Sequence, residues 1–137
     1  MKPLELMAKA RRAQVSAQRL LEDNDSDGAC NRAYYAMFDA ARAALIASEA
    51  PVPPEIAKTH SGLISAFSLH LVKTGLFPVE LGRSLNKAED LRLVADYKSG
   101  SIDAESAQWA IVAAKAFIVE VGLRFLPNDL ARPAGDS

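Results

Sequence analysis

Apolar residues recur every three or four positions along nearly the whole chain, and this spacing restricts the fold more than any other feature. A repeat near 3.6 residues places such side chains on one face of an α-helix, whereas a half-buried strand needs alternation at every second residue. No segment shows convincing two-residue alternation. Because short connections between long helices favour antiparallel neighbours, the sequence predicts an all-α protein. We expect an antiparallel up-and-down bundle of four to five helices.

Proline, glycine and short polar runs divide the chain into its predicted elements. We expect helices over about residues 3–22, 27–48, 55–74, 78–97 and 101–125, with Gly75 closing the third of them. In the first helix the inward residues are expected to be Leu4, Met7, Ala10, Ala17 and Leu21. Residues 1–126 are predicted to form a single domain, and 127–137 a disordered tail.

Length, charge and cysteine usage exclude several classes of protein. A chain of 137 residues is long enough to bury a core without disulfides, and the single cysteine, Cys30, excludes an intramolecular disulfide and a cysteine-cluster zinc site. A net charge of −1 gives no global basic field for nucleic acid. The N-terminus lacks the apolar run of a signal peptide, and no stretch is expected to approach a membrane span. A cytoplasmic protein without a cofactor is therefore expected.

The predicted helix over residues 27–48 has an unusually wide apolar surface. Apolar and small residues cover nearly half of its circumference, so it is either the central helix or part of a second interface. Its opposite arc is polar. That arc is either an ordinary solvated face or one wall of a polar groove. The arc contains Asn31, Arg32, Tyr35, Asp39 and Arg42.

Arg92 and Asp96 are predicted to point inward from the helix over residues 78–97. At 100° per residue they fall on or beside the apolar stripe of that helix, which contains Leu81, Leu85, Ala88 and Ala95. Charge on an apolar face is costly unless it is paired and hydrogen-bonded. The pair therefore either holds the fold together or lines a site.

The two histidines, His60 and His70, give no metal-binding pattern, so no metal site is expected. His60 falls on an apolar helical stripe, where a hydrogen-bonded core histidine is commoner than a catalytic one. Gly62 lies inside the same predicted helix, and it suggests that a neighbouring helix packs closely there. The glycines form no phosphate-binding loop.

Three blocks of sequence together resemble HEPN domains, the small α-helical partners of minimal nucleotidyltransferases. The first block, 31–41 (NRAYYAMFDAA), is similar to the second-helix signature of that family. The second, 58–64 (KTHSGLI), is similar to its third-helix block, and the third, 92–97 (RLVADY), to its Arg-x-x-Ala-Asp-Tyr block. The resemblance covers roughly residues 3–125. It implies a compact helical bundle that commonly dimerises through helices rich in small residues. It also implies a nucleotidyltransferase partner in a toxin–antitoxin or related defence module.

Many members of that family are metal-independent ribonucleases with an arginine, four to six residues, and then a histidine. The histidine can move a proton at the 2′-hydroxyl, and the arginine can stabilise the phosphorane. Here no histidine follows Arg92, and no arginine lies within seven positions upstream of His60 or His70. Asp96 stands near the expected place of the histidine, and an ionised carboxylate is a poor substitute beside phosphate. The ribonuclease role therefore does not carry over by motif.

Three hypotheses remain open. The leading one is a non-catalytic homodimer that binds a nucleotidyltransferase partner, with RNA or a nucleotide as a further ligand in a polar cleft. The alternative is a ribonuclease toxin with a rearranged active site that uses Arg92 and His60, with Asp96 as a third candidate. The last is a purely structural subunit in which Arg92 and Asp96 form an internal strut. The predicted cleft residues are Asn31, Tyr35, His60, Arg92, Asp96 and Tyr97.

Overall fold

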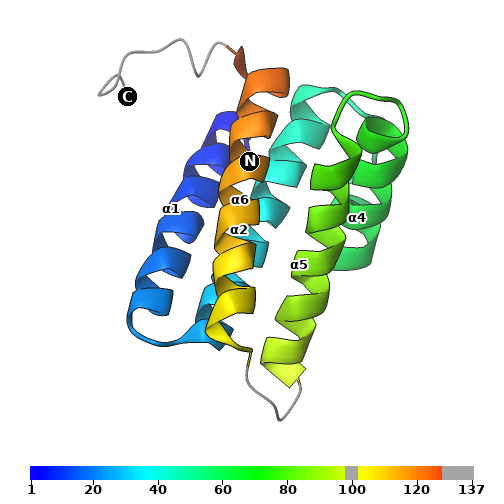
Figure 1. Cartoon of the computed structure of the whole chain (residues 1–137). Helices are drawn as coiled ribbons and strands as arrows, with labels where there is room; N and C mark the ends of the chain where they lie inside the picture. Colours follow the sequence, from blue (N-terminus) through cyan, green and yellow to red (C-terminus); the bar gives the residue numbers. More distant parts are fainter. Residues whose placement is uncertain (98–101, 128–137) are drawn as a thin grey trace.

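Long helices run side by side along the molecule, and the computed structural model describes residues 1–97 and 102–127. Every regular element in these residues is helical, which confirms the predicted all-α bundle. The start of α1 and the end of α6 lie at the same end of the bundle (Figure 1). The four long helices are α1 (Pro3–Glu22), α2 (Ser26–Ala47), α5 (Val79–Tyr97) and α6 (Ala104–Phe125).

Helix α2 is the central helix, as its wide apolar surface predicts. It packs against α1, α6, α5 and a further helix, α4 (His60–Phe67). In Figure 1 α6 lies in front of α2, between α1 and α5. The alanines of α2 from Ala33 to Ala44 are buried inside the domain, where they let the neighbouring helices approach closely. These small residues are therefore used within one chain and are not available as a dimer surface.

The third predicted helix is divided, so the expectation of one helix over residues 55–74 is wrong. A single turn, α3 (Pro54–Ala57), precedes α4, and a π-helical turn, η1 (Ser68–Val72), follows it. The break occurs because the Thr59 hydroxyl caps α4: it accepts a hydrogen bond from the Gly62 N–H at 3.0 Å. The chain then leaves η1 through Gly75, whose φ of 81° suits a glycine after a helix.

The close contact at Gly62 is made by a different element from the predicted one. A Cβ at this position would collide with the backbone carbonyl of Ile56 and with the hydroxyl of Thr59. Glycine is needed because α3 folds back onto the first turn of α4. Close packing at Gly62 was predicted and is found, but the packing element is the single turn α3, which the sequence placed in the same helix as Gly62.

The buried face of α1 differs by two positions from the predicted face at its start. Leu4 is 41% exposed, whereas Leu6 is fully buried. The buried stripe passes through Leu6, Met7 and Ala10, and a residue two positions before Leu6 points to the opposite side of a helix with 3.6 residues per turn. The inward positions predicted for Ala10 and Ala17 are confirmed.

Helix α6 is the one described helix that is long and apolar enough to cross a membrane, with a mean hydropathy of 1.3 over its best window. This corrects the expectation that no stretch approaches a membrane span. Half of that window is buried against the rest of the domain, and the core helix of a bundle has the same length and composition. The predicted tail, beyond Pro127, lies outside the described residues.

Candidate functional site

Arg92 is a buried cation on α5, as predicted, with only 4% of its surface exposed. Its Nη2 atom donates to both carboxylate oxygens of Glu89, at 2.9 and 3.0 Å, and its Nη1 atom donates to Asp96 Oδ2 at 3.4 Å. The guanidinium carbon lies 5.2 Å from the ring centroid of Tyr34 and 6.0 Å from that of Tyr35. Two carboxylates and two aromatic rings of α2 therefore surround the guanidinium group.

The pKa of Arg92 stays high in this environment. Burial alone would lower this pKa, but the hydrogen bond to Glu89 and the charge of Glu89 outweigh burial and raise it. Arg92 is therefore always charged. Arg92 faces the carboxylates of both Glu89 and Asp96, so the three side chains together carry a formal charge of −1. This net negative charge disfavours a phosphate ligand at this position.

Asp96 does not point inward, so this half of the predicted pair is corrected. Its side chain is 29% exposed and lies at the edge of the contact between α5 and α2. There it accepts hydrogen bonds from Asn31 Nδ2 at 3.2 and 3.4 Å. Asp96 thus links Arg92 on α5 to Asn31 on α2.

His60 lies at the first position of α4 and contacts α2 through both ring nitrogens. Its Nδ1 atom is 2.9 Å from the Tyr34 hydroxyl, and its Nε2 atom is 3.5 Å from the Tyr35 hydroxyl. Burial raises the pKa of Tyr34 above its usual value, so this hydroxyl keeps its proton. The sequence favoured a hydrogen-bonded core histidine; His60 is hydrogen-bonded, but it is only partly buried.

The structure brings together five of the six predicted cleft residues, which converge on the side of α2 between α4 and α5. Tyr97 is the exception: it is 76% exposed, and within residues 1–97 and 102–127 it makes no hydrogen bond or ring contact with the others. We call the assembled group the Arg92 cluster. Its members are Asn31, Tyr34, Tyr35, His60, Glu89, Arg92 and Asp96.

Two members of the Arg92 cluster were missed by the sequence reasoning. Glu89 precedes Arg92 by three residues, and this helical spacing brings opposite charges together, so the signal was present. Tyr34 belongs to the wide apolar surface of α2, and its type and position gave no sign of a polar contact. Its ring is fully buried there, yet its hydroxyl reaches His60. A buried tyrosine commonly finds such a partner.

Asp39, one helical turn beyond Tyr35 on α2, is also buried, with 4% of its surface exposed. The interpretation of the polar arc as an ordinary solvated face therefore fails at this residue. Burial raises the pKa of Asp39, although the charges of Lys9, Arg42 and Arg32 partly counteract this effect. The carboxylate is thus held in a region of positive potential without full solvation.

The substitution Asp39→Asn tests this raised pKa through the pH dependence of stability. An acid whose pKa is higher in the folded state stabilises the fold below its unfolded-state pKa, and this contribution is lost as the pH rises through the folded-state value. Relative to Asp39→Asn, the wild type should therefore lose free energy of unfolding as the pH rises from the acid range. Urea unfolding at a series of pH values measures the difference. A wild type that gains stability relative to Asp39→Asn over that range would contradict the assignment.

The described residues offer little for other chemistry. No group of three or more histidine, cysteine, aspartate and glutamate side chains within them is placed to hold a metal ion. Burial, with the nearby charges of Asp27 and Asp103, raises the pKa of the Cys30 thiol to about 11. A buried, protonated thiol is a poor nucleophile.

The fold and the cluster together define the class of protein: a small helical bundle whose central helix carries an Asn–Tyr–Tyr face against a histidine and a buried arginine. Residues 4–124 match the HEPN domain family. A UPF0332 protein of Gloeobacter violaceus is 35% identical over 124 residues, which cover 89% of this chain and 94% of that protein. The chain belongs to the HEPN domain family.

Two relatives in Methanocaldococcus jannaschii have names that refer to toxins. The protein named "Putative toxin MJ0142" is 27% identical over 133 residues, covering 96% of this chain and 87% of the relative. The protein named "Putative toxin MJ0605" is 34% identical over 105 residues, covering 76% of this chain and 75% of the relative. These names agree with the expected toxin–antitoxin context and favour neither a catalytic nor a non-catalytic role.

Proposed function

We propose that this HEPN domain is a non-catalytic, dimeric component of a toxin–antitoxin-like module in the cytoplasm, where it binds a nucleotidyltransferase partner. RNA or a nucleotide is its further ligand. The observation that carries the non-catalytic role is the state of Arg92. An arginine that stabilises a phosphorane needs donors aimed at the reacting phosphate. Here both terminal nitrogens already donate to carboxylates, Nη2 to Glu89 and Nη1 to Asp96, and Nε, which has no partner within the described residues, is buried.

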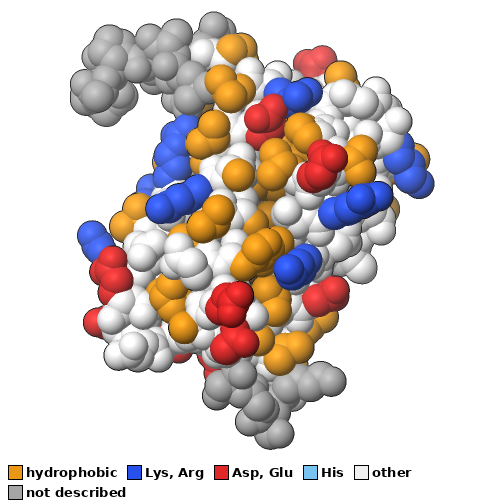
Figure 2. All heavy atoms as spheres, in the orientation of Figure 1, with side chains coloured by type: hydrophobic (Ala, Val, Ile, Leu, Met, Phe, Trp, Pro, Cys, Tyr) orange, Lys and Arg blue, Asp and Glu red, His pale blue; other side chains and the backbone are white. Residues whose placement is uncertain are grey.

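The homodimer needs a surface other than the alanines of α2, which are buried within the domain. Helix α6 supplies one. Figure 2 shows apolar side chains gathered on the face where α6 lies between α1 and α5. The exposed apolar residues of α6 are Val112, Val119 and Leu123, each more than half exposed. Exposed apolar surface of this kind supports association with a second protein chain.

The ribonuclease alternative is favoured by a pair of tyrosine rings that His60 and Arg92 share. His60 and Arg92 lie on different helices, yet both contact the rings of Tyr34 and Tyr35. The rearranged ribonuclease site would use His60 to move a proton, and its Nε2 atom faces the half-buried Tyr35 and not the core. For this function a substrate would have to displace Glu89 or Asp96 from Arg92.

One set of preparations tests both functions. The chain is purified alone and with the product of the neighbouring gene, and each sample is analysed by size exclusion with light scattering. We expect a dimer, a nucleotidyltransferase as the neighbouring product, and a stoichiometric complex of the two; a monomer that does not bind that product would overturn the proposal. RNA integrity is then followed in cells that express the wild type or His60→Gln, with His70→Gln as the matched control. RNA cleavage that is lost only in His60→Gln would establish the ribonuclease instead.

A further inference from the structure

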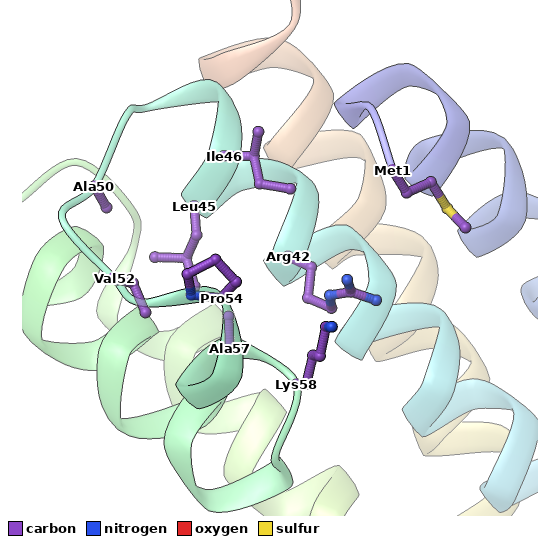
Figure 3. Close-up of a pocket in the computed structure, with 9 residues that line it drawn as sticks. All are labelled: Met1, Arg42, Leu45, Ile46, Ala50, Val52, Pro54, Ala57 and Lys58. Carbon is purple, nitrogen blue, oxygen red and sulfur yellow. The ribbon is translucent and has the colours of Figure 1, made fainter.

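A concave region lies away from the Arg92 cluster, at the far end of α2. It is a pocket of about 360 Å³ between the end of α2, the connector that follows it, and α3. This volume is within the range of pockets that hold small organic molecules. Its lining is mostly apolar and includes Leu45, Ile46, Val52 and Pro54. Figure 3 shows these side chains around the opening.

Two cations from different elements lie at one side of this pocket. Arg42 comes from α2 and Lys58 follows α3, and Figure 3 shows their nitrogen-bearing ends near one another. None of the lining residues is acidic. Within the part of the chain that the structure describes, no ion pair joins Arg42 or Lys58 to a carboxylate. The positive charge of Arg42 acts on the buried carboxylate of Asp39, as do the charges of Lys9 and Arg32.

The pocket and the Arg92 cluster therefore have opposite electrostatic character. In the cluster one cation faces two carboxylates, whereas the pocket is lined by two cations and by no carboxylate. The two regions share no residue. Arg42 follows Tyr35 by seven residues, which places it on the same side of α2 about 10 Å further along the helix axis. An anion should prefer the pocket.

The geometry points to a binding site for a phosphate monoester with an apolar or flat organic body, such as a nucleoside monophosphate. A guanidinium fork pairs with two phosphate oxygens, and an ammonium group adds a second positive charge. Two cations match the dianion of a monoester better than the single charge of a carboxylate or a phosphodiester. The apolar lining then covers the organic body. The ligand is either a free nucleotide or the phosphorylated end of an RNA strand, so this inference rests on the nucleotide or RNA ligand of the proposed function and not on its partner, its dimer or its non-catalytic role.

Isothermal titration of the full chain with AMP tests the site, with adenosine and inorganic phosphate as separate titrants. AMP should bind saturably, and adenosine should bind at least about tenfold more weakly because it lacks the charge. Arg42→Gln and Lys58→Gln should each weaken AMP binding by about tenfold or more. Lys58 is exposed, so its substitution leaves the fold intact. Lys73→Gln and Arg83→Gln remove the same charge from exposed positions outside the pocket and should bind AMP as the wild type does.

The source of the ligand is distinguished with a short RNA that carries either a 5′-phosphate or a 5′-hydroxyl. Binding of only the phosphorylated strand, with the same loss in Arg42→Gln and Lys58→Gln, assigns the site to a strand end. Binding of AMP with equal or higher affinity assigns it to a free nucleotide. The inference is overturned if neither AMP nor the phosphorylated strand binds at millimolar concentration. It is equally overturned if adenosine binds as well as AMP, or if the pocket variants bind like their controls.

Discussion

Replacing Arg92 with alanine should cost the fold about 3 kcal/mol, the lower end of the range of about 3–5 kcal/mol for breaking a buried ion pair. The side chain of Arg92 is 5% exposed and that of Glu89 is 16% exposed, so alanine would leave a poorly solvated carboxylate without its partner. The packing of the guanidinium against Tyr34 would be lost as well. Urea unfolding followed by far-UV circular dichroism measures the loss.

Matched variants separate the ion pair from a general effect on α5. Arg83→Ala removes an exposed arginine from the same helix and should change the stability little. Glu89→Gln combined with Arg92→Ala should be more stable than Arg92→Ala alone, because the unpaired carboxylate is then absent. If Arg92→Ala loses no more stability than Arg83→Ala, Arg92 is not a strut, and its availability for a ligand has to be reconsidered.

This result bears directly on function. A residue held ready for catalysis is commonly not optimised for stability, and its removal is often neutral or stabilising. A large loss of stability on removing Arg92 therefore favours the proposed non-catalytic role over the ribonuclease alternative. It also explains why a ligand is better sought at Arg42 and Lys58, whose charges no acidic lining residue of that pocket neutralises.

The sequence predicted the bundle well because burial follows helical periodicity. The width of the apolar surface on α2 indicated either a central helix or a second interface, and the structure makes it the central helix. The buried position of Arg92 followed from its place on the stripe of α5. Asp96 was misplaced for a physical reason. Periodicity gives the direction of a side chain but not the width of the contact with the next helix, and Asp96 falls just outside that contact.

The break before α4, the Tyr34–His60 contact and the pocket could not be predicted from the spacing of apolar residues. The break before α4 arises from a hydroxyl cap at Thr59, which competed locally with a continuous helix. The cluster of Tyr34 and His60 joins residues 26 positions apart, and the pocket at Arg42 and Lys58 combines two helices and a connector. Such sites require the packed structure.

Phe77→Ala should cause a stability loss of about 3–5 kcal/mol, the usual cost of removing a buried phenylalanine ring. Phe77 lies between η1 and α5, and its surface is only 2% exposed. Its ring centroid lies 5.0 Å from those of Phe67 and Phe117. The Phe77 ring therefore joins the segment formed by α4 and η1 to α6. Losing the ring leaves a cavity where α4, which begins at His60, and η1 pack against the core. Chemical denaturation of the purified chain measures the loss.

Leu76→Ala is the control for this prediction, because Leu76 is adjacent in sequence but 50% exposed. It should change the free energy of unfolding by much less, since little of its surface is buried on folding. Amide hydrogen exchange adds a local measure: in Phe77→Ala the amides of α4 and η1 should lose more protection than those of α1. Equal losses of stability in Phe77→Ala and Leu76→Ala would show that the rings of Phe67, Phe77 and Phe117 do not anchor α4 and η1. The position of His60 against Tyr34 and Tyr35 would then depend on the contact of α4 with α2 alone.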